Sequence, residues 1–280
     1  MLFVPGTKPA FIENARALHP DCVILDLEGD LPVSEKDSAR ILVRTALRNL
    51  DFGSIEVIVR INTLETGLFL KDLQAVVPQK PDAVRVPFIR SAEDVRKVSS
   101  AIAKIESRLK MPRNGIRLHV MIENAQAASS AFEISLASSR TDVLALGGQD
   151  YAANLRLTRT RKGEELASVR NQMVQAARCA NLDAIDTLYP DFKDIEGLIE
   201  DTRYSKAVGF DGRIVINPIQ IKHVHQVYKP TEQELAAARR LVTNAKLETI
   251  EGDKVWTFEG RMIDPALINH AKRTILWTGE

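Results

Sequence analysis

Charged residues and glycines recur at the ends of short apolar runs in this sequence. Asp26 and Glu28 end the run CVILDLE, Arg60 lies in VIVRIN, Glu123 ends RLHVMIE, and Asp150 follows LALGGQ. Scattered charges ordinarily lie on exposed helix faces, so this placement is the main functional signal. If the runs are parallel strands of one barrel, the residues just past their carboxyl ends share one rim. Other residues at such positions are Pro5, Gly6, Asn62, Pro87, Asn124, Gly147, Gly148, Gln149, Asp186, Asn217 and Pro218.

Glu123 and Asp150 are candidate metal ligands. RLHVMI is too apolar to leave the Glu123 carboxylate without a partner, so this acid either pairs with an arginine or binds a cation. Asp150 either caps the helix that follows or binds the same cation. Gly147 and Gly148 would let the backbone approach a ligand closely and turn N–H groups toward it. Two carboxylates without an adjacent His or Cys suit Mg²⁺, which keeps positions open for water and substrate, whereas zinc prefers nitrogen and sulfur.

Arg60 interrupts an otherwise apolar run, where it either pairs with a structural acid or contacts an anion. Its planar guanidinium suits a carboxylate or a developing enolate oxygen. Asp26 and Glu28 occupy alternate positions, so both side chains point the same way onto the rim, for catalysis or for pairing with an arginine. The uncharged rim residues are weaker candidates, each explained more simply by the shaping of a loop: Asn62, Pro87 and Asn217.

The elements that would carry these residues alternate along the chain. About eight apolar runs are nearly all separated by stretches of helical period, which predicts parallel strands joined by helical crossovers. Helices are expected to begin near Ser34, with Asp37 three residues on, at Ser91, and near Gln126. The runs are almost continuously apolar and number about eight, which favours a closed (β/α)₈ TIM barrel over an open sheet.

After residue 228 the pattern changes. TEQELAAARRLVTNAKLET is expected to form one capped amphipathic helix, KVWTFEGRMI a hairpin, and the remaining residues a final helix. We therefore predict a barrel over residues 1–228 and a C-terminal helical extension over residues 229–280. The extension is expected to pack on the barrel or on a neighbouring subunit.

Composition suits one large barrel and excludes several classes of protein. The 280 residues, 45% of them hydrophobic, can bury one large core, and single α/β barrels commonly run to about 250 residues. The net charge of +1, from 38 basic and 37 acidic residues, argues against the long basic face of a nucleic-acid binder. Cys22 and Cys179 form no disulfide framework, and neither a signal peptide nor a membrane span is evident, so we expect a cytoplasmic protein.

Motifs at these same residues resemble those of the citrate lyase β-subunit family, within the larger group of metal-dependent aldolase-like and malyl- or citramalyl-thioester lyases. The likeness runs along nearly the whole chain and keeps the motifs in order. They are LFVPG (2–6), ILDLE (24–28), VRIN (59–62), IEN (122–124), ALGGQDYAAN (145–154), AIDTLYPD (184–191), GFDGRIVINPIQI (209–221) and GRMID (260–264).

The resemblance implies a lyase that breaks a carbon–carbon bond of a citryl- or citramalyl-type thioester, giving a 2-keto acid and an acetyl thioester by retro-Claisen chemistry. It implies Glu123 and Asp150 as the Mg²⁺ ligands and Arg60 as the contact to the substrate carboxylate and thioester carbonyl. Glu28 would hold metal-bound water. Asp264 would reach the site from the extension of a neighbouring subunit, as in a homotrimer, and protonate the enolate carbon.

The same resemblance leaves the substrate's carrier open between coenzyme A and an acyl carrier protein. The basic loop LRLTRTRK (155–162) is expected either to meet the phosphates of the carrier or to be simply solvated. Two departures from the family pattern affect specificity and leave the metal pair intact. Gly29 and then Asp30 stand where the family usually has a second acid after Glu28, and Val86-Pro87-Phe88 lacks the lysine of Leu-Pro-Lys.

Two other functions are compatible with these residues. One is a pyruvate-type class II aldolase that acts on free keto acids without a thioester. The other is a non-catalytic binding component of a citrate lyase complex, which the departures at Gly29 and Phe88 favour.

Overall fold

A closed ring of eight parallel strands forms the core of the computed structural model, which describes residues 1–29, 31–248, 256–258 and 261–276. The strands pair in sequence order, and a parallel bridge between Leu2 and Val215 joins the last to the first. At this junction the N–H of Phe3 donates to the Val215 carbonyl at 3.0 Å. The predicted barrel is therefore confirmed. Its strands are β1 (Leu2–Pro5), β2 (Cys22–Asp26), β3 (Glu56–Arg60), β4 (Ala83–Val86), β5 (Arg117–Ile122), β6 (Thr141–Leu146), β7 (Asp183–Asp186) and β8 (Gly212–Arg213).

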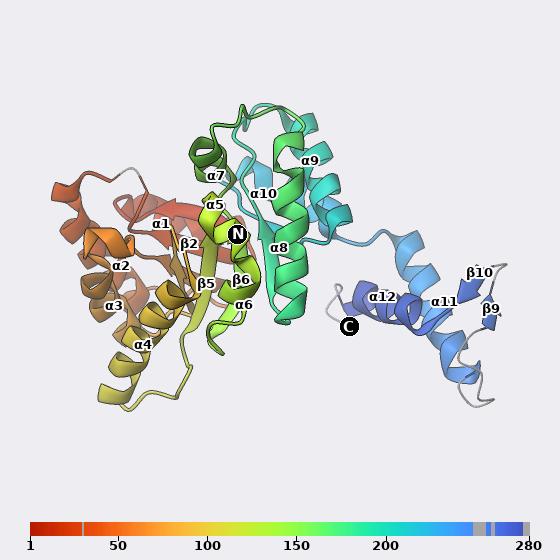
Figure 1. Ribbon diagram of the computed structural model, residues 1–280, viewed down its shortest axis with the longest axis horizontal. Helices are drawn as coiled ribbons and strands as arrows, with labels where there is room; N and C mark the ends of the chain where they lie inside the picture. The colour runs from red at the N-terminus through yellow and green to blue at the C-terminus, as the bar shows by residue number, and fades with distance from the viewer. Residues whose placement is uncertain (30, 249–255, 259–260, 277–280) are drawn as a thin grey trace. The chain divides into compact units, whose positions relative to one another are not determined.

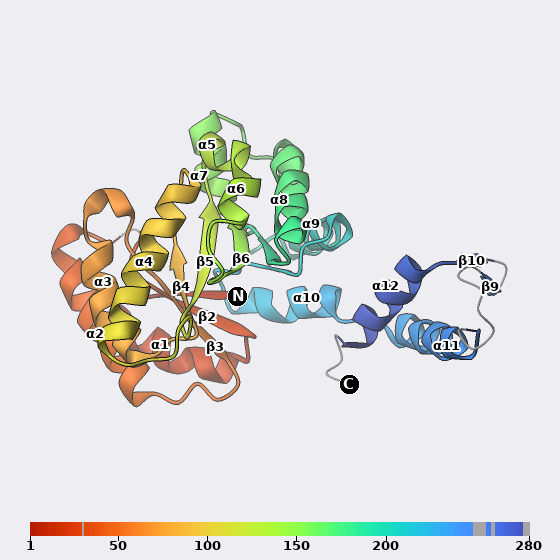
Figure 2. The same cartoon turned by 60° about the horizontal axis from the view of Figure 1, so that its bottom comes forward.

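Helices surround these strands on the outside (Figures 1 and 2). Strands covered by helices on one face and by the barrel interior on the other are buried throughout, as all five residues of β2 and all four of β4 show. The longer apolar side chains of the interior meet in a cluster that includes Met121, Val143 and Ile185. The helices are α1 (Pro9–Ala15), α2 (Lys36–Asn49), α3 (Phe69–Val76), α4 (Ala92–Arg108), α5 (Ala125–Ser129), α6 (Ala131–Ser135), α7 (Gly148–Leu155), α8 (Ala167–Cys179), α9 (Ile195–Val208) and α10 (Ile219–Tyr228).

The structure tests the three predicted helix starts, at Ser91, near Ser34 and near Gln126. Ser91 caps α4, because its hydroxyl accepts the Asp94 N–H at 3.3 Å and the Asp94 carboxylate accepts the Ser91 N–H at 3.1 Å. The helix expected near Ser34 is present: a 3₁₀ turn (Val33–Glu35) leads into α2, which begins at Lys36. The expected cap was wrong, because α2 has no side-chain cap. The helix expected from Gln126 is divided into α5 and α6 at Ser130, whose backbone leaves the helical conformation.

The chain divides into two compact units, Met1–Val224 and His225–Glu280, and the division falls within α10. The second unit contains α11 (Glu232–Glu248), the antiparallel pair of β9 (Trp256–Phe258) and β10 (Arg261–Ile263), and α12 (Pro265–Leu276). This is the helix, hairpin and helix that the sequence predicts, although part of the predicted hairpin, including Gly260, lies outside the described residues. Where the extension packs stays a prediction.

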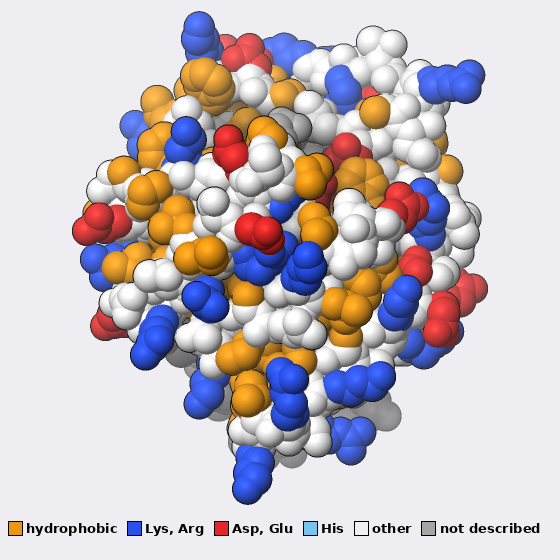
Figure 3. All heavy atoms as spheres, turned by 90° about the vertical axis from the view of Figure 1, so that its left-hand side faces the viewer, with side chains coloured by type: hydrophobic (Ala, Val, Ile, Leu, Met, Phe, Trp, Pro, Cys, Tyr) orange, Lys and Arg blue, Asp and Glu red, His pale blue; other side chains and the backbone are white. Residues whose placement is uncertain are grey.

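The surface agrees with the balanced charge of the sequence. On the face drawn in Figure 3, Lys and Arg side chains are interspersed with acidic and hydrophobic ones. In the described ranges, no helix is both long enough and apolar enough to cross a membrane.

A buried network of four charged side chains joins the end of the barrel to its outer helices. Asp201 on α9 is shared by two arginines: one oxygen lies 2.9 Å from Arg170 Nη1, the other 2.6 Å from Arg213 Nη2. Arg170 also contacts Asp186, at the end of β7, at 2.9 Å. All four side chains are at most 3% exposed, so each charge depends on its partners instead of on water.

The change Asp201→Ala should therefore destabilise the barrel strongly, because it leaves two buried guanidinium groups without their shared carboxylate. We expect the free energy of unfolding to fall by about 3–5 kcal/mol in urea denaturation. As a control, Glu93→Ala removes one partner of the exposed pair with Arg96 and should cost less than about 1 kcal/mol. Equal losses in the two variants would contradict a structural role for the network.

Candidate active site

A pocket of about 720 Å³ opens where the strands end. Most of the charged residues predicted for the rim line it, although they come from distant parts of the sequence. Parallel strands in one barrel bring their carboxyl ends to the same side, and this geometry gathers the residues. The predicted residues that line the pocket are Pro5, Asp26, Glu28, Arg60, Glu123, Gly147, Gly148, Gln149 and Asp150.

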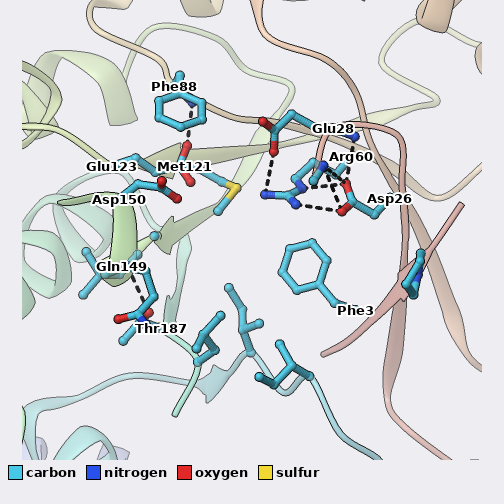
Figure 4. Close-up of a pocket in the computed structure, with 18 of the residues that line it drawn as sticks. Phe3, Asp26, Glu28, Arg60, Phe88, Met121, Glu123, Gln149, Asp150 and Thr187 are labelled. Carbon is cyan, nitrogen blue, oxygen red and sulfur yellow. Dashed lines mark hydrogen bonds and ion pairs between the residues drawn. The ribbon is translucent and has the colours of Figure 1, made fainter. Parts of the chain in front are cut away.

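Arg60, the last residue of β3, is fixed by two acids of the β2 end. Its Nε and Nη2 each lie 2.7 Å from an oxygen of Asp26, and its Nη1 lies 2.9 Å from Glu28 (Figure 4). The guanidinium also lies over the Phe3 ring, 4.6 Å from its centroid. The expected pairing of Arg60 with acids is confirmed. Arg60 also lines the pocket, so its contact with an anion stays a prediction.

The two acids that bind Arg60 differ in electrostatics. Burial opposes the charge of Asp26, but Arg60 and the N–H groups of Glu28 and Gly29 outweigh it and lower the pKa of this carboxyl group. For Glu28, burial is the larger effect and raises the pKa despite the neighbouring Arg60. Asp26 is therefore the firm counter-ion of Arg60, while Glu28 is the better proton acceptor.

Glu123 follows β5 and is 1% exposed. One of its oxygens accepts the N–H of Phe88 at 2.6 Å, and the other is buried without a hydrogen-bond partner in the described part of the chain. Burial without full compensation raises the pKa of Glu123 to about 8, although the Phe88 N–H and Arg60 partly offset it. In this position Glu123 either holds a proton or, as a carboxylate, needs a cation beside it.

Asp150 lies in the first turn of α7 and is exposed. Figure 4 shows its carboxylate beside that of Glu123. Its charge raises the pKa of both Glu123 and Glu28, as expected of a third acid close to them. The two acids predicted as ligands therefore approach one another at the pocket.

Gly147 makes this approach possible, whereas Gly148 packs against Thr187 and Leu166. A side chain on Gly147 would collide with the Glu123 carboxylate. However, the Gly147 N–H donates to the Ile122 carbonyl and the Gly148 N–H to the Thr187 hydroxyl, both at 3.0 Å. Tertiary contacts already use both N–H groups, so the expectation that they turn toward a ligand was wrong. Contact between the two glycines and a substrate stays a prediction.

Thr187, which sequence reasoning missed, connects the buried charged network to α7. Its hydroxyl accepts the Gly148 N–H, and its own N–H donates to Asp186 at 2.8 Å. Its carbonyl accepts from Arg213 at 3.0 Å. The backbone N–H and carbonyl of Thr187 are thus both held by hydrogen bonds. Its hydroxyl in turn holds Gly148, two residues before Asp150. No property of the threonine in AIDTLYPD alone signals this contact.

Other predicted residues lie away from the pocket lining. Pro87 is buried, and its neighbour Phe88 lines the pocket in its place, with a backbone N–H that the sequence could not reveal. Asn62 binds Asp72, Asn124 caps α5, and Asn217 binds its own loop, so these three shape the chain. Lys8, Thr7 and Phe3 also line the pocket but carried no signal in the sequence.

Two further predictions concern residues outside this group. In the basic loop 155–162, Arg159 and Arg161 already pair with Glu165 and Asp194, at 2.8 and 2.6 Å, so much of its charge is neutralised within the chain. Asp264 belongs to the second unit, where its carboxylate accepts the Leu267 N–H at 2.8 Å and caps α12. Its delivery to a neighbouring active site remains a prediction.

The donor set fits Mg²⁺. The described residues contain no group of three or more His, Cys, Asp or Glu side chains placed to bind an ion. Glu123 and Asp150, whose carboxylates lie side by side, are the two acids that would hold one. Mg²⁺ is commonly bound through one or two carboxylates and completes its octahedron with water and substrate. The unpartnered buried oxygen of Glu123 is the position that such an ion would satisfy.

The sequence of this chain matches that of a known protein family. Residues 1–218 match the family described as HpcH/HpaI aldolase/citrate lyase. The chain belongs to this family. Among its relatives, the citrate lyase subunit beta of Haemophilus influenzae is 37% identical over 272 residues, covering 97% of this chain and 94% of that protein. The mitochondrial citramalyl-CoA lyase of Mus musculus is 29% identical over 287 residues, covering 98% and 84%.

Solved structures of the same family share the fold. Protein CitE from Mycobacterium tuberculosis, in complex with magnesium, acetoacetate and coenzyme A, has a TM-score of 0.81 and 31% identity. The match covers 100% of this chain and 97% of the CitE chain. A citrate lyase beta subunit from M. tuberculosis, complexed with oxaloacetate and magnesium, has a TM-score of 0.69 and 32% identity, with coverage of 82% and 96%.

Thr187→Val should weaken Mg²⁺ binding by about 10- to 100-fold, the usual effect of removing a hydrogen bond behind a metal ligand. The hydroxyl that accepts the Gly148 N–H is lost, while the volume of the side chain is kept. Titration calorimetry with Mg²⁺ gives the dissociation constant. Thr187→Ser retains the hydroxyl and should bind Mg²⁺ nearly as the parent does. If Val and Ser bound the ion equally well, Thr187 would not position Asp150.

Proposed function

We propose that this protein is a Mg²⁺-dependent carbon–carbon lyase that cleaves a 2-hydroxy-acid thioester of the citryl or citramalyl type. The products would be a 2-keto acid and an acetyl thioester. The observation that carries this proposal is the pairing of Glu123 and Asp150 beside Arg60 in one pocket. It is supported by relatives named citrate lyase subunit beta, citramalyl-CoA lyase and L-malyl-CoA/beta-methylmalyl-CoA lyase.

In this proposal Glu123 and Asp150 bind the ion. Mg²⁺ bound there would supply a Lewis acid for the carboxylate and hydroxyl of the substrate and would lower the pKa of that hydroxyl. Glu28 accepts the hydroxyl proton, directly or through water, because its raised pKa makes it a better base than Asp26. The electrons of the O–H bond then form the keto group as the carbon–carbon bond breaks.

Arg60 stabilises the charge that this cleavage places on the thioester oxygen. Its three contacts with Asp26 and Glu28 fix the guanidinium before substrate arrives, so little reorganisation is needed. A donor of this kind typically contributes about 3–4 kcal/mol to the transition state. We propose that Asp264 of a neighbouring subunit then protonates the enolate carbon and completes the acetyl thioester.

The assembly follows from that last step. Sharing of Asp264 requires a homo-oligomer, and we propose a homotrimer. The relative crystallised with coenzyme A supports a thioester of coenzyme A as substrate, while the relatives named as subunits support a carrier protein within a citrate lyase complex. Free thiols at Cys22 and Cys179 support a cytoplasmic location.

Asp150→Asn should abolish Mg²⁺-dependent cleavage while the barrel stays folded, because the exposed position tolerates the change but a ligand charge is lost. We expect turnover of whichever of citramalyl-, malyl- and citryl-CoA the parent cleaves to fall by at least about 10³-fold, with an unchanged melting temperature. Glu133→Gln, an exposed acid on α6, is the matched control and should keep full activity. Full turnover by Asp150→Asn with chelated metal would refute the proposal.

The same assay separates the alternatives. Cleavage of free 4-hydroxy-2-keto acids, but of none of the thioesters, would identify an aldolase. Activity that appears only when partner subunits are added would identify a component of a complex.

Arg60→Lys should lower kcat by about 10²-fold, because a point charge replaces the planar group that two acids orient. Steady-state kinetics on the thioester that is cleaved best provides the test. The exposed change Arg96→Lys controls for the loss of a guanidinium elsewhere. A parental kcat in Arg60→Lys would mean that Arg60 only supports the fold.

A further inference from the structure

Positive side chains are scarce in the pocket. Among the described residues that line it, the cations are Arg60 and Lys8. Arg60 already uses Nε, Nη1 and Nη2 on Asp26 and Glu28. Lys8 is exposed, at the residue before α1, and so lies in contact with water. Lys8 has no acidic partner among the described residues, but water competes with any ligand for its charge.

Acidic side chains are more numerous than these cations. Four carboxylates line the same pocket: Asp26, Glu28, Glu123 and Asp150. When ionised, the four carboxylates carry four negative charges, and Arg60 and Lys8 carry two positive ones. A bound divalent ion would therefore only make the pocket neutral. One substrate carboxylate can bind that ion. A second would lose water beside the four carboxylates, with the water-exposed Lys8 as the lining cation not already held by acids, which is costly.

The remaining wall of the pocket is apolar. Phe88 stands next to Glu123 in Figure 4, and its backbone is fixed there by the hydrogen bond from its N–H to Glu123. Its φ of 50° is unusual for a bulky residue, which indicates that the surroundings determine its position. Other apolar side chains line the same space: Phe3, Met121, Leu146, Leu188 and Ile214. An alkyl group gains from contact with these side chains, whereas a carboxylate does not.

We propose that this pocket selects hydroxyacyl thioesters with a single free carboxylate, the one on the carbon that bears the hydroxyl, and that Phe88 determines this selectivity. Malyl and citramalyl thioesters belong to this class and release glyoxylate and pyruvate. A citryl thioester carries a second free carboxylate, releases oxaloacetate, and is rejected. The inference rests on the proposed lyase function and names its substrate class.

The test compares kcat/KM for citramalyl-CoA and citryl-CoA in the parent, Phe88→Lys and Phe88→Leu. We expect the parent to prefer citramalyl-CoA by at least about tenfold. Phe88→Lys places a cation at the apolar wall and should raise the citryl-to-citramalyl ratio by at least about tenfold. Phe88→Leu keeps the wall apolar and should leave the ratio unchanged. Equal use of both thioesters by the parent, or a preference for citryl-CoA, would overturn the inference.

A binding measurement distinguishes failure of this inference from failure of the lyase proposal. Titration calorimetry of the full chain with pyruvate and with oxaloacetate, each in the presence of Mg²⁺, requires no turnover. We expect pyruvate to bind at least about tenfold more tightly, and Phe88→Lys to reduce this difference. If neither thioester is cleaved, the lyase proposal fails, and the keto-acid preference alone decides the inference. Tighter or equal binding of oxaloacetate would then contradict it.

Discussion

A buried carboxylate with one unpaired oxygen is the constraint on which the site depends. Glu123 is enclosed at the end of β5, where the Phe88 N–H satisfies one oxygen and no described residue satisfies the other. Leaving a charged oxygen in this state is costly, so the protein either protonates it or supplies a cation. The nearby carboxylate of Asp150 raises this cost, because two acids side by side repel each other until a proton or a cation neutralises them.

The barrel converts this constraint into a fixed geometry. Asp150 lies on a short helix whose first residue is bound to Thr187, and Thr187 is bound in turn to Asp186 and Arg213. Arg60 is likewise oriented by two acids before any ligand arrives. The groups that would meet a substrate are therefore positioned by buried charge pairs between strands and outer helices. Such pairs add rigidity even where their net contribution to stability is small.

Features of the fold and the site that depend on the overall pattern of apolar residues were predictable from the sequence, whereas local turns were not. The eight strands and the rim position of Asp26, Arg60, Glu123 and Asp150 were predictable, because burial on both faces leaves continuous apolar runs and parallel strands end on one side. The break between α5 and α6 and the uncapped start of α2 were missed, since short-range turns competed with helical period there.

The errors at the site have another cause, which is backbone chemistry. The N–H of Phe88 donates to Glu123, and the backbone of Phe88 has a positive φ, but no side-chain pattern encodes either feature. The N–H groups of Gly147 and Gly148 looked free in the sequence, yet their partners come from Ile122 and Thr187. Residue types at strand ends thus locate a site, while its donors depend on tertiary contacts.

The most direct test of the account is the position of the ion itself. Crystals grown with Mn²⁺ in place of Mg²⁺ would give an anomalous difference map in which the ion is identified by its own scattering. The account predicts one strong peak between Glu123 and Asp150, with an oxygen of each within about 2.2 Å. A peak bound to other residues, or none between these two acids at saturating Mn²⁺, would contradict it.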